Sequence, residues 1–170
     1  SPDWAAQMVT LEYMKAGLFF ERLEAFRDVY RQKRDLMCSL IDAFADQYGF
    51  TREQALRMSA SFGGGIGRMR ETCGAACGLF MLAGFKTGAI EGDDSEGKAA
   101  NYALVQKLAE EFKKRNGALK CAELLGLVKA ENKVYNTEAR TQQYYAKRPC
   151  VQMVEEAARI WCDYLSGNIK

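Results

Sequence analysis

The stretch that decides the fold is FGGGIGRMRETCGAACG, residues 62–78, in which a glycine run leads to two cysteines four positions apart. Glycine lacks a Cβ atom, so the chain can turn sharply here and pass close to another segment or to a small ligand. We expect Gly63, Gly64 and Gly65 to make that close approach, as weak candidates for contact with a bound group. The run predicts a tight loop that delivers Cys73 to the first turn of a helix.

The glycine run does not predict a nucleotide site. A phosphate loop needs the pattern Gly-x-x-x-x-Gly-Lys-Ser/Thr after a strand, and a dinucleotide fingerprint also needs a preceding strand. The residues before the run are typical of a short helix instead, in which Thr51 and Gln54 fit a capping box. The helix after the run is expected to start at Glu71 or Thr72, to reach about Ala83 and to stop at Gly84.

Helical periodicity continues on both sides of this region, with almost no alternation of period two. The upstream stripe consists of Phe19, Leu23, Phe26, Tyr30, Met37, Ile41, Phe44 and Tyr48, with Gly49 as a stop signal. Downstream, residues 87–97 resemble an exposed loop, and a helix ending near Gly117 has the stripe Tyr102, Val105, Leu108 or Ala109, and Phe112. A short apolar helix begins at Cys121. A last helix begins with Pro149 and has the stripe Val151, Val154, Ala158, Trp161 and Leu165. The pattern predicts an all-α, single-domain helical bundle over residues 1–170, with the glycine-rich loop leading into a central cysteine-bearing helix.

The charge balance and the absence of histidine exclude several functions. The 24 basic and 22 acidic residues give a net charge of +2, so the electrostatic argument for nucleic-acid binding is missing. Without histidine, the chain cannot form a Ser-His-Asp triad, a Cys-His dyad, a His-ligated zinc site or a haem-attaching Cys-x-x-Cys-His motif. The six cysteines are therefore the residues on which chemistry depends.

The distribution of apolar residues and cysteines sets expectations about the compartment. The sequence contains no run of about 18 apolar residues, so no membrane span is predicted. The first residues, Ser-Pro-Asp-Trp, do not resemble a signal peptide. The cysteine density is far below that of a disulfide scaffold, so we expect a reducing cytoplasm. The long upstream apolar stripe could be larger than one small bundle can bury. A homodimer is one way to bury the remaining apolar surface.

Three cysteines are expected at helix N-termini: Cys73, Cys121 and Cys150. Unpaired backbone N–H groups and the positive end of the helix dipole favour an anion there, which lowers a thiol pKa. Arg68 and Arg70 add positive charge near Cys73 and favour its thiolate further. Three such placements in one small protein predict that the thiols converge.

The other three cysteines have structural explanations. Cys38 and Cys162 lie within helices beside apolar residues and are typical of small buried hydrophobes. Cys77 shares a helix face with Cys73, and a disulfide within one regular helix is geometrically awkward. Cys77 could serve as a second ligand of one metal or could simply belong to the core.

Residues 62–78 resemble the signature of the C_GCAxxG_C_C family, whose members are described as redox-active. The resemblance places its four cysteines at Cys38, in MCSLIDAF; Cys73, in CGAACG; Cys121, in CAELLG; and Cys150, in RPCV. It extends over about residues 19–165, raises Cys38 to a site residue, and leaves Cys77 and Cys162 outside the pattern. A relative, the split-Soret type of cytochrome, is thought to hold an iron–sulfur centre on similar cysteines.

Three functions remain open at this point. Two or more of the cysteines Cys38, Cys73, Cys121 and Cys150 could cycle between dithiol and disulfide, or pass electrons, with a redox partner protein, and Cys73 would be the attacking thiolate. The same four thiolates could instead be the ligands of a 2Fe–2S iron–sulfur centre or of a structural zinc ion, for electron transfer or stability. Inert cysteines in a helical interaction protein are the third alternative.

Overall fold

The computed structural model describes residues 41, 44–127 and 148–169 of the 170-residue chain. Within these residues the secondary structure is helical and contains no strand. The one extended pairing recorded there is an isolated antiparallel bridge between Thr72 and Lys120. The prediction of an all-α fold is confirmed.

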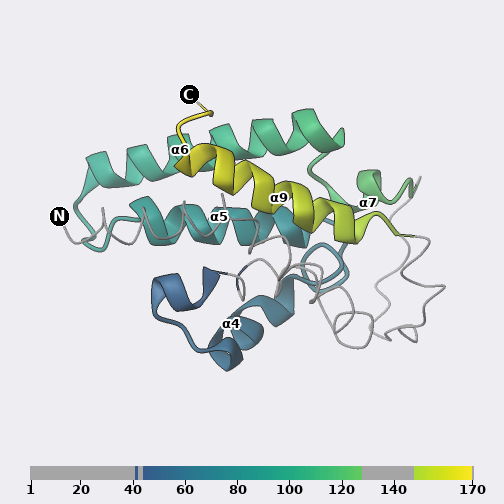
Figure 1. The fold of residues 1–170 in the computed structure, drawn as a ribbon, viewed down its shortest axis with the longest axis horizontal. Coiled ribbons are helices and arrows are strands. Elements are labelled where there is room, and N and C mark those ends of the chain that lie inside the picture. Colours follow the sequence, from purple (N-terminus) through teal and green to yellow (C-terminus); the bar gives the residue numbers. More distant parts are fainter. Residues whose placement is uncertain (1–40, 42–43, 128–147, 170) are drawn as a thin grey trace.

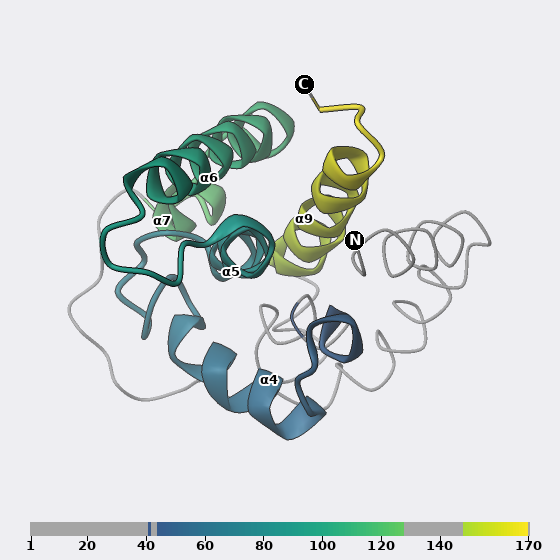
Figure 2. The same cartoon turned by 90° about the vertical axis from the view of Figure 1, so that its left-hand side faces the viewer.

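The described helices, in chain order, are η1 (Asp46–Tyr48), α4 (Arg52–Ser59), η2 (Ala60–Phe62), α5 (Gly74–Thr87), α6 (Ser95–Asn116), α7 (Cys121–Leu124) and α9 (Cys150–Leu165). Figure 1 shows α5, α6 and α9 side by side, with α7 beyond one end of them and α4 on the opposite side of α5 from α6. The view along the bundle in Figure 2 places α5 between α6, α9 and α4. The cysteine-bearing helix α5 is therefore the central one, as predicted.

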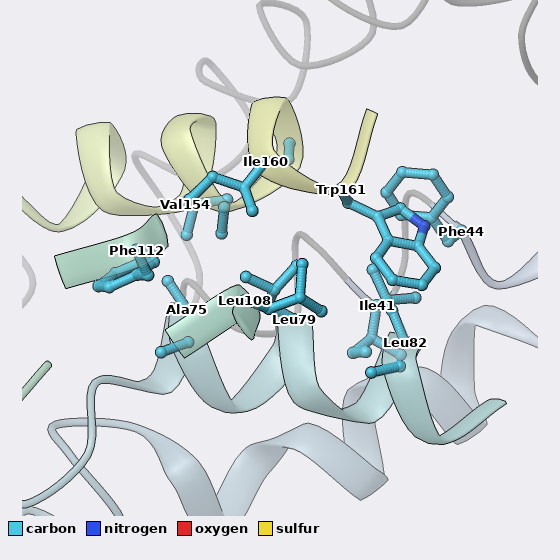
Figure 3. Close-up of a cluster of buried hydrophobic side chains, with 14 of the residues drawn as sticks. Ile41, Phe44, Ala75, Leu79, Leu82, Leu108, Phe112, Val154, Ile160 and Trp161 are labelled. Atoms are coloured by element: carbon cyan, nitrogen blue, oxygen red, sulfur yellow. The ribbon is translucent and has the colours of Figure 1, made fainter. Parts of the chain in front are cut away.

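The core lies where α5, α6 and α9 meet (Figure 3). The fully buried side chains of this region include Leu79 and Leu82 from α5, Leu108 and Phe112 from α6, and Ile160 and Trp161 from α9. Helix α5 buries small residues as well, among them Ala75, Ala76 and Gly78. Small side chains let neighbouring helices approach closely, and a helix that is apolar on most of its surface belongs in a core. The close packing of α5 thus follows from its composition.

The predicted stripes of the last two long helices are correct in part. In α9, Val154, Ala158 and Trp161 are buried as expected. In α6 the buried residues are Leu104, Leu108 and Phe112, spaced four apart, whereas Tyr102 is 63% exposed. The buried face of α6 is therefore rotated from the predicted one, because α5 and α9 pack on the side that presents Leu104.

The helix ends agree with local signals except at α5 and at α9, where Pro149 is the N-cap and Cys150 is the first helical residue. The Thr51–Gln54 capping box is present at the start of α4, and Gly117 ends α6 with a φ of 87°. Helix α5 starts at Gly74, after the predicted Glu71 or Thr72, because Thr72 pairs with Lys120. The helix also continues through Gly84.

Gly84 was expected to stop α5, but the helix ends at Thr87 instead. An interior glycine costs a helix about 1 kcal/mol relative to alanine. The burial of Leu82 and Ala83 beside Gly84 offsets that cost.

The upstream stripe lies largely outside the described residues. Of its members, Ile41 and Phe44 are described and buried, and Tyr48 ends the η1 turn before Gly49, which has a φ of 75°. Residues 1–40, and with them Cys38 and the stripe from Phe19 to Met37, fall outside the described part of the chain. Among the described helices, none combines the length and apolarity that a membrane crossing requires.

Candidate functional site

The glycine run forms a left-handed loop. Five consecutive residues have positive φ: Gly64 (67°), Gly65 (74°), Ile66 (57°), Gly67 (56°) and Arg68 (66°). Arg70 follows with a φ of 62°. This conformation suits glycine, but it costs a residue with a side chain roughly 1 kcal/mol or more. The strain at Ile66, Arg68 and Arg70 must therefore be maintained by contacts elsewhere.

Backbone hydrogen bonds attach the loop to the start of α7. The Cys121 N–H donates to the Glu71 carbonyl at 2.6 Å, and the Ala122 N–H donates to the Arg70 carbonyl at 3.1 Å. Inside the loop, the Glu71 N–H donates to the Gly65 carbonyl at 3.1 Å. These bonds place the loop directly against Cys121.

Gly65 is the point of closest approach. A Cβ atom at this position would lie 2.5 Å from the Cys121 Cβ and 2.9 Å from the Glu71 carbonyl oxygen, which is closer than real atoms pack. The close approach of the glycine run is therefore made to another segment of the chain. The sequence had left this alternative open beside approach to a ligand, and contact of Gly63, Gly64 or Gly65 with a bound group stays a prediction.

A second connection places Cys73 beside the same segment. The Cys73 N–H donates to the Leu119 carbonyl at 2.9 Å, next to the Thr72–Lys120 bridge. Cys73 and Cys121 each follow a member of this bridge, so they occupy diagonal positions in the pairing. Diagonal neighbours in an antiparallel pair lie roughly 7–8 Å apart and share a face. Two cysteines 48 positions apart in the sequence thus lie close together.

Cys73 is the N-cap residue of α5 and makes no side-chain cap hydrogen bond, although the Ala75 and Ala76 backbone N–H groups act to lower the pKa of its thiol. Burial nevertheless raises the pKa of the Cys73 thiol to about 11, and the nearby thiols of Cys121 and Cys150 contribute to the rise. The expectation of a lowered pKa at Cys73 is wrong, because desolvation of the charged form outweighs the two amides.

Cys150 is the first residue of α9 and lies within electrostatic reach of Cys121. Burial raises the pKa of the Cys150 thiol, and Cys121 raises it further, whereas the charges of Arg148 and Arg70 lower it. The positive charge of Arg70 therefore acts on Cys150, and not on Cys73 as the sequence suggested. The sequence correctly predicted that Arg70 places positive charge near the thiols, but it assigned that charge to Cys73, which is the nearer thiol in sequence.

The structure brings together Cys73, Cys121 and Cys150, which start three helices far apart in the chain. Cys77 is buried one turn along α5, where burial raises its pKa to about 11. Cys162 lies three turns along α9, and burial raises its pKa to about 12. Neither thiol is among the causes of the shifts at Cys73 and Cys150, which agrees with a structural role for both. The fourth expected site residue, Cys38, is outside the described residues.

The thiols do not form a recognisable metal centre in the part of the chain described. Among these residues, no group of three or more Cys, Asp or Glu side chains has an arrangement that could hold a metal ion. Tetrahedral zinc and iron–sulfur sites need ligand atoms converging on one point. The described cysteines by themselves do not fit such a group, although all five are free thiols.

The chain matches a known protein family over most of its length. The family model described as "Putative redox-active protein (C_GCAxxG_C_C)" matches residues 37–164, which is most of the chain and includes all three clustered cysteines. No curated protein and no solved structure matches the chain significantly.

Proposed function

Because the chain belongs to the C_GCAxxG_C_C family of redox-active proteins, we propose that its clustered cysteines carry out thiol–disulfide exchange. The single observation that supports this proposal best is the proximity of Cys73, Cys121 and Cys150 as free thiols. Two thiols that lie close together can form a disulfide and release two electrons to an oxidant, without any other cofactor.

Cys150 is proposed as the attacking thiol. The thiolate is the reactive form of cysteine, and positive charge nearby favours it. Arg148 and Arg70 supply that charge at Cys150, whereas only backbone amides oppose burial at Cys73. This assignment replaces Cys73, which the sequence favoured as the nucleophile.

Cys121 is proposed as the resolving thiol. It influences the pKa of both Cys73 and Cys150, so it is the thiol that the two others share as a neighbour. After Cys150 attacks the disulfide of an oxidised partner, Cys121 would attack the mixed disulfide and release the partner as a thiol. The product is a Cys121–Cys150 disulfide.

The test is a thiol count and a disulfide map of anaerobically reduced, full-length protein after mild oxidation with diamide. The expected result is a loss of two free thiols out of six and a peptide that links Cys121 to Cys150. Cys121→Ser should trap a mixed disulfide on Cys150 with an added disulfide reagent. Cys77→Ser is the matched control, since Cys77 is a buried thiol one turn from Cys73, and it should behave like the wild type.

Two results would overturn the proposal. Charge-transfer bands in the visible spectrum, or stoichiometric zinc in elemental analysis, would show that Cys38 joins the other thiols in a metal centre. A thiol count that stays at six without bound metal would indicate inert cysteines in an interaction protein. A cytoplasmic location belongs to the same proposal, because a reducing compartment keeps such thiols available for exchange.

A further inference from the structure

Arg70 is a charged residue in an unusual position. Its side chain is only 9% exposed, and its backbone has a φ of 62°, in a loop that otherwise uses glycine for much of this conformation. The Gly64 carbonyl accepts its N–H at 3.3 Å, and the Ala122 N–H donates to its carbonyl at 3.1 Å, so the residue is fixed beside the first turn of α7. A glycine would fit this backbone without strain. The chain thus places an arginine side chain at the thiol cluster in spite of the conformational cost.

Among the residues that the structure describes, the guanidinium of Arg70 forms no hydrogen bond or ion pair. The adjacent carboxylate of Glu71 is directed to Lys120, 3.9 Å away, and the side chain of Glu71 is 57% exposed. Burying a cation without a partner is energetically unfavourable, so a buried charge is usually paired or bound to a ligand.

Of the helix starts near Arg70, those of α5 and α9 are free of negative charge, whereas α7 has Glu123 in its first turn. Within the described chain, α5 and α9 carry no acidic residue in the first turn and no side-chain cap. Their positive ends and Arg70 therefore point to the same small region, where Cys150 lies within reach of the Arg70 charge. An arginine and helix amides together are typical of sites that bind the oxygens of an anion.

We propose that Arg70 binds the carboxylate of the molecule that exchanges with Cys150, so that the preferred substrate is a small disulfide bearing a carboxylate. This inference rests on the thiol–disulfide function proposed above and names its substrate class. The planar guanidinium can bind a carboxylate with two parallel hydrogen bonds, which orients the substrate as well as attracting it.

The exchange balances without a further reactant. The Cys150 thiolate attacks one sulfur of the substrate disulfide, forms a mixed disulfide and expels the first half of the substrate as a thiolate. Cys121, losing its proton to solvent, attacks the Cys150 sulfur and expels the second half. The protein loses two electrons and two protons, and the substrate becomes two thiols, each carrying the carboxylate away from Arg70.

The experiment compares three disulfides of similar size with full-length reduced protein: dithiodipropionate, which is anionic, hydroxyethyl disulfide, which is neutral, and cystamine, which is cationic. We expect dithiodipropionate to react about tenfold faster than the neutral compound and cystamine to react slowest, a preference that weakens with added salt. In Arg70→Met this preference should disappear, whereas Arg70→Lys should retain part of it. Arg68→Met is the matched control, because it removes the same charge from the same left-handed loop, and it should keep the preference.

The outcomes separate the two proposals. If none of the three disulfides reacts, the thiol–disulfide function fails. If all three react at similar rates, or if Arg70→Met behaves like the wild type, exchange occurs but the role of Arg70 is refuted. Should Arg70→Met fail to fold, the charge series and its salt dependence in the wild type, Arg70→Lys and Arg68→Met still decide the question.

Discussion

The starts of α4 and α6 differ from the starts of α5 and α9. Thr51 caps α4 by accepting the Gln54 N–H, and Asp94 caps α6 by accepting the Gly97 N–H at 2.8 Å. Helix α5 has Cys73 as its N-cap, and α9 begins at Cys150 after Pro149; neither start has a side-chain cap hydrogen bond. The first pair uses its N-terminal amides for stability, which is worth about 1 kcal/mol at each cap. The second pair leaves these amides without a side-chain cap, with a cysteine thiol beside each helix start.

This difference separates two roles of helix starts in the protein: the starts of α4 and α6 stabilise the fold, whereas those of α5 and α9 carry the cysteines of the candidate site. The capped starts are exposed and locally encoded, whereas the cysteine-bearing starts lie at one end of the central bundle, next to a strained loop and a buried arginine. Burial at that end raises the pKa of the Cys73 and Cys150 thiols; backbone amides act against this rise at both thiols, and the charges of Arg148 and Arg70 also act against it at Cys150. The site is therefore governed by its surroundings more than by the helix dipole.

The largest expected effect comes from the contact between the loop and α7. Gly65→Ala should destabilise the protein by roughly 3 kcal/mol or more, because its Cβ would meet the Cys121 Cβ at 2.5 Å in a left-handed backbone. Gly49→Ala has the same sign of φ, 75°, but among the described residues no atom lies within 4 Å of the added Cβ, so it should cost only about 1 kcal/mol. Denaturant unfolding of the two variants measures the difference. Equal losses would show that the loop does not press on Cys121.

The next effect concerns thiol reactivity. Burial raises the pKa of Cys77 to about 11 from an ordinary value of 9.0, so its thiolate fraction near neutral pH should fall about 100-fold. Alkylation of Cys77 in native protein should therefore be at least about 100-fold slower than in unfolded protein. Mass spectrometry of iodoacetamide-labelled peptides gives the rate at each cysteine. Fast native labelling of Cys77 would contradict the assignment of this thiol to the core.

The same shift gives the sign of a pH effect on stability. Because the folded pKa of Cys77 is higher than the unfolded one, the unfolded state loses its proton first as the pH rises. The free energy of unfolding should thus be unaffected by this group below pH 9 and should decrease as the pH approaches about 11. Cys77→Ala should reduce that alkaline decrease, as measured by denaturant unfolding across this pH range. An unchanged slope would show that Cys77 titrates normally in the folded protein.

A smaller effect is expected at the exposed cap. Thr51→Ala removes the capping box of α4 and should cost about 1 kcal/mol of stability without changing thiol exchange. Urea unfolding and the rate of reaction with dithiodipropionate test the two parts of this prediction. A change in the exchange rate would mean that the two kinds of helix start are coupled.

The smallest effect is expected at the uncapped start of α5. Cys73→Ser introduces a hydroxyl at an N-cap position, where serine is a preferred residue, so stability should change by less than about 1 kcal/mol. The Cys121–Cys150 disulfide should still form, since Cys73 is neither the proposed attacking thiol nor the resolving one. Peptide mapping after mild oxidation checks this outcome, and its absence would move Cys73 into the exchanging pair.

Local signals in the sequence predicted the helices better than their ends and faces. Thr51 and Gln54 predicted their cap because the two residues interact within one turn. Thr72 was wrongly included in α5 because its partner, Lys120, lies 48 residues away. Gly84 failed as a stop because packing of the surrounding helix outweighs the propensity of one residue.

The sequence by itself determined the helical class, the family and the identity of the cysteines at helix starts, because these depend on periodicity, short-range caps and a local motif. Only the tertiary structure decided how far burial raises the thiol pKa values, which thiol has positive charge beside it, and what the glycines approach. Those properties depend on burial and on segments that are distant in the chain. A helix start can therefore be identified from its neighbours in sequence, but the pKa of its thiol is set by its neighbours in space.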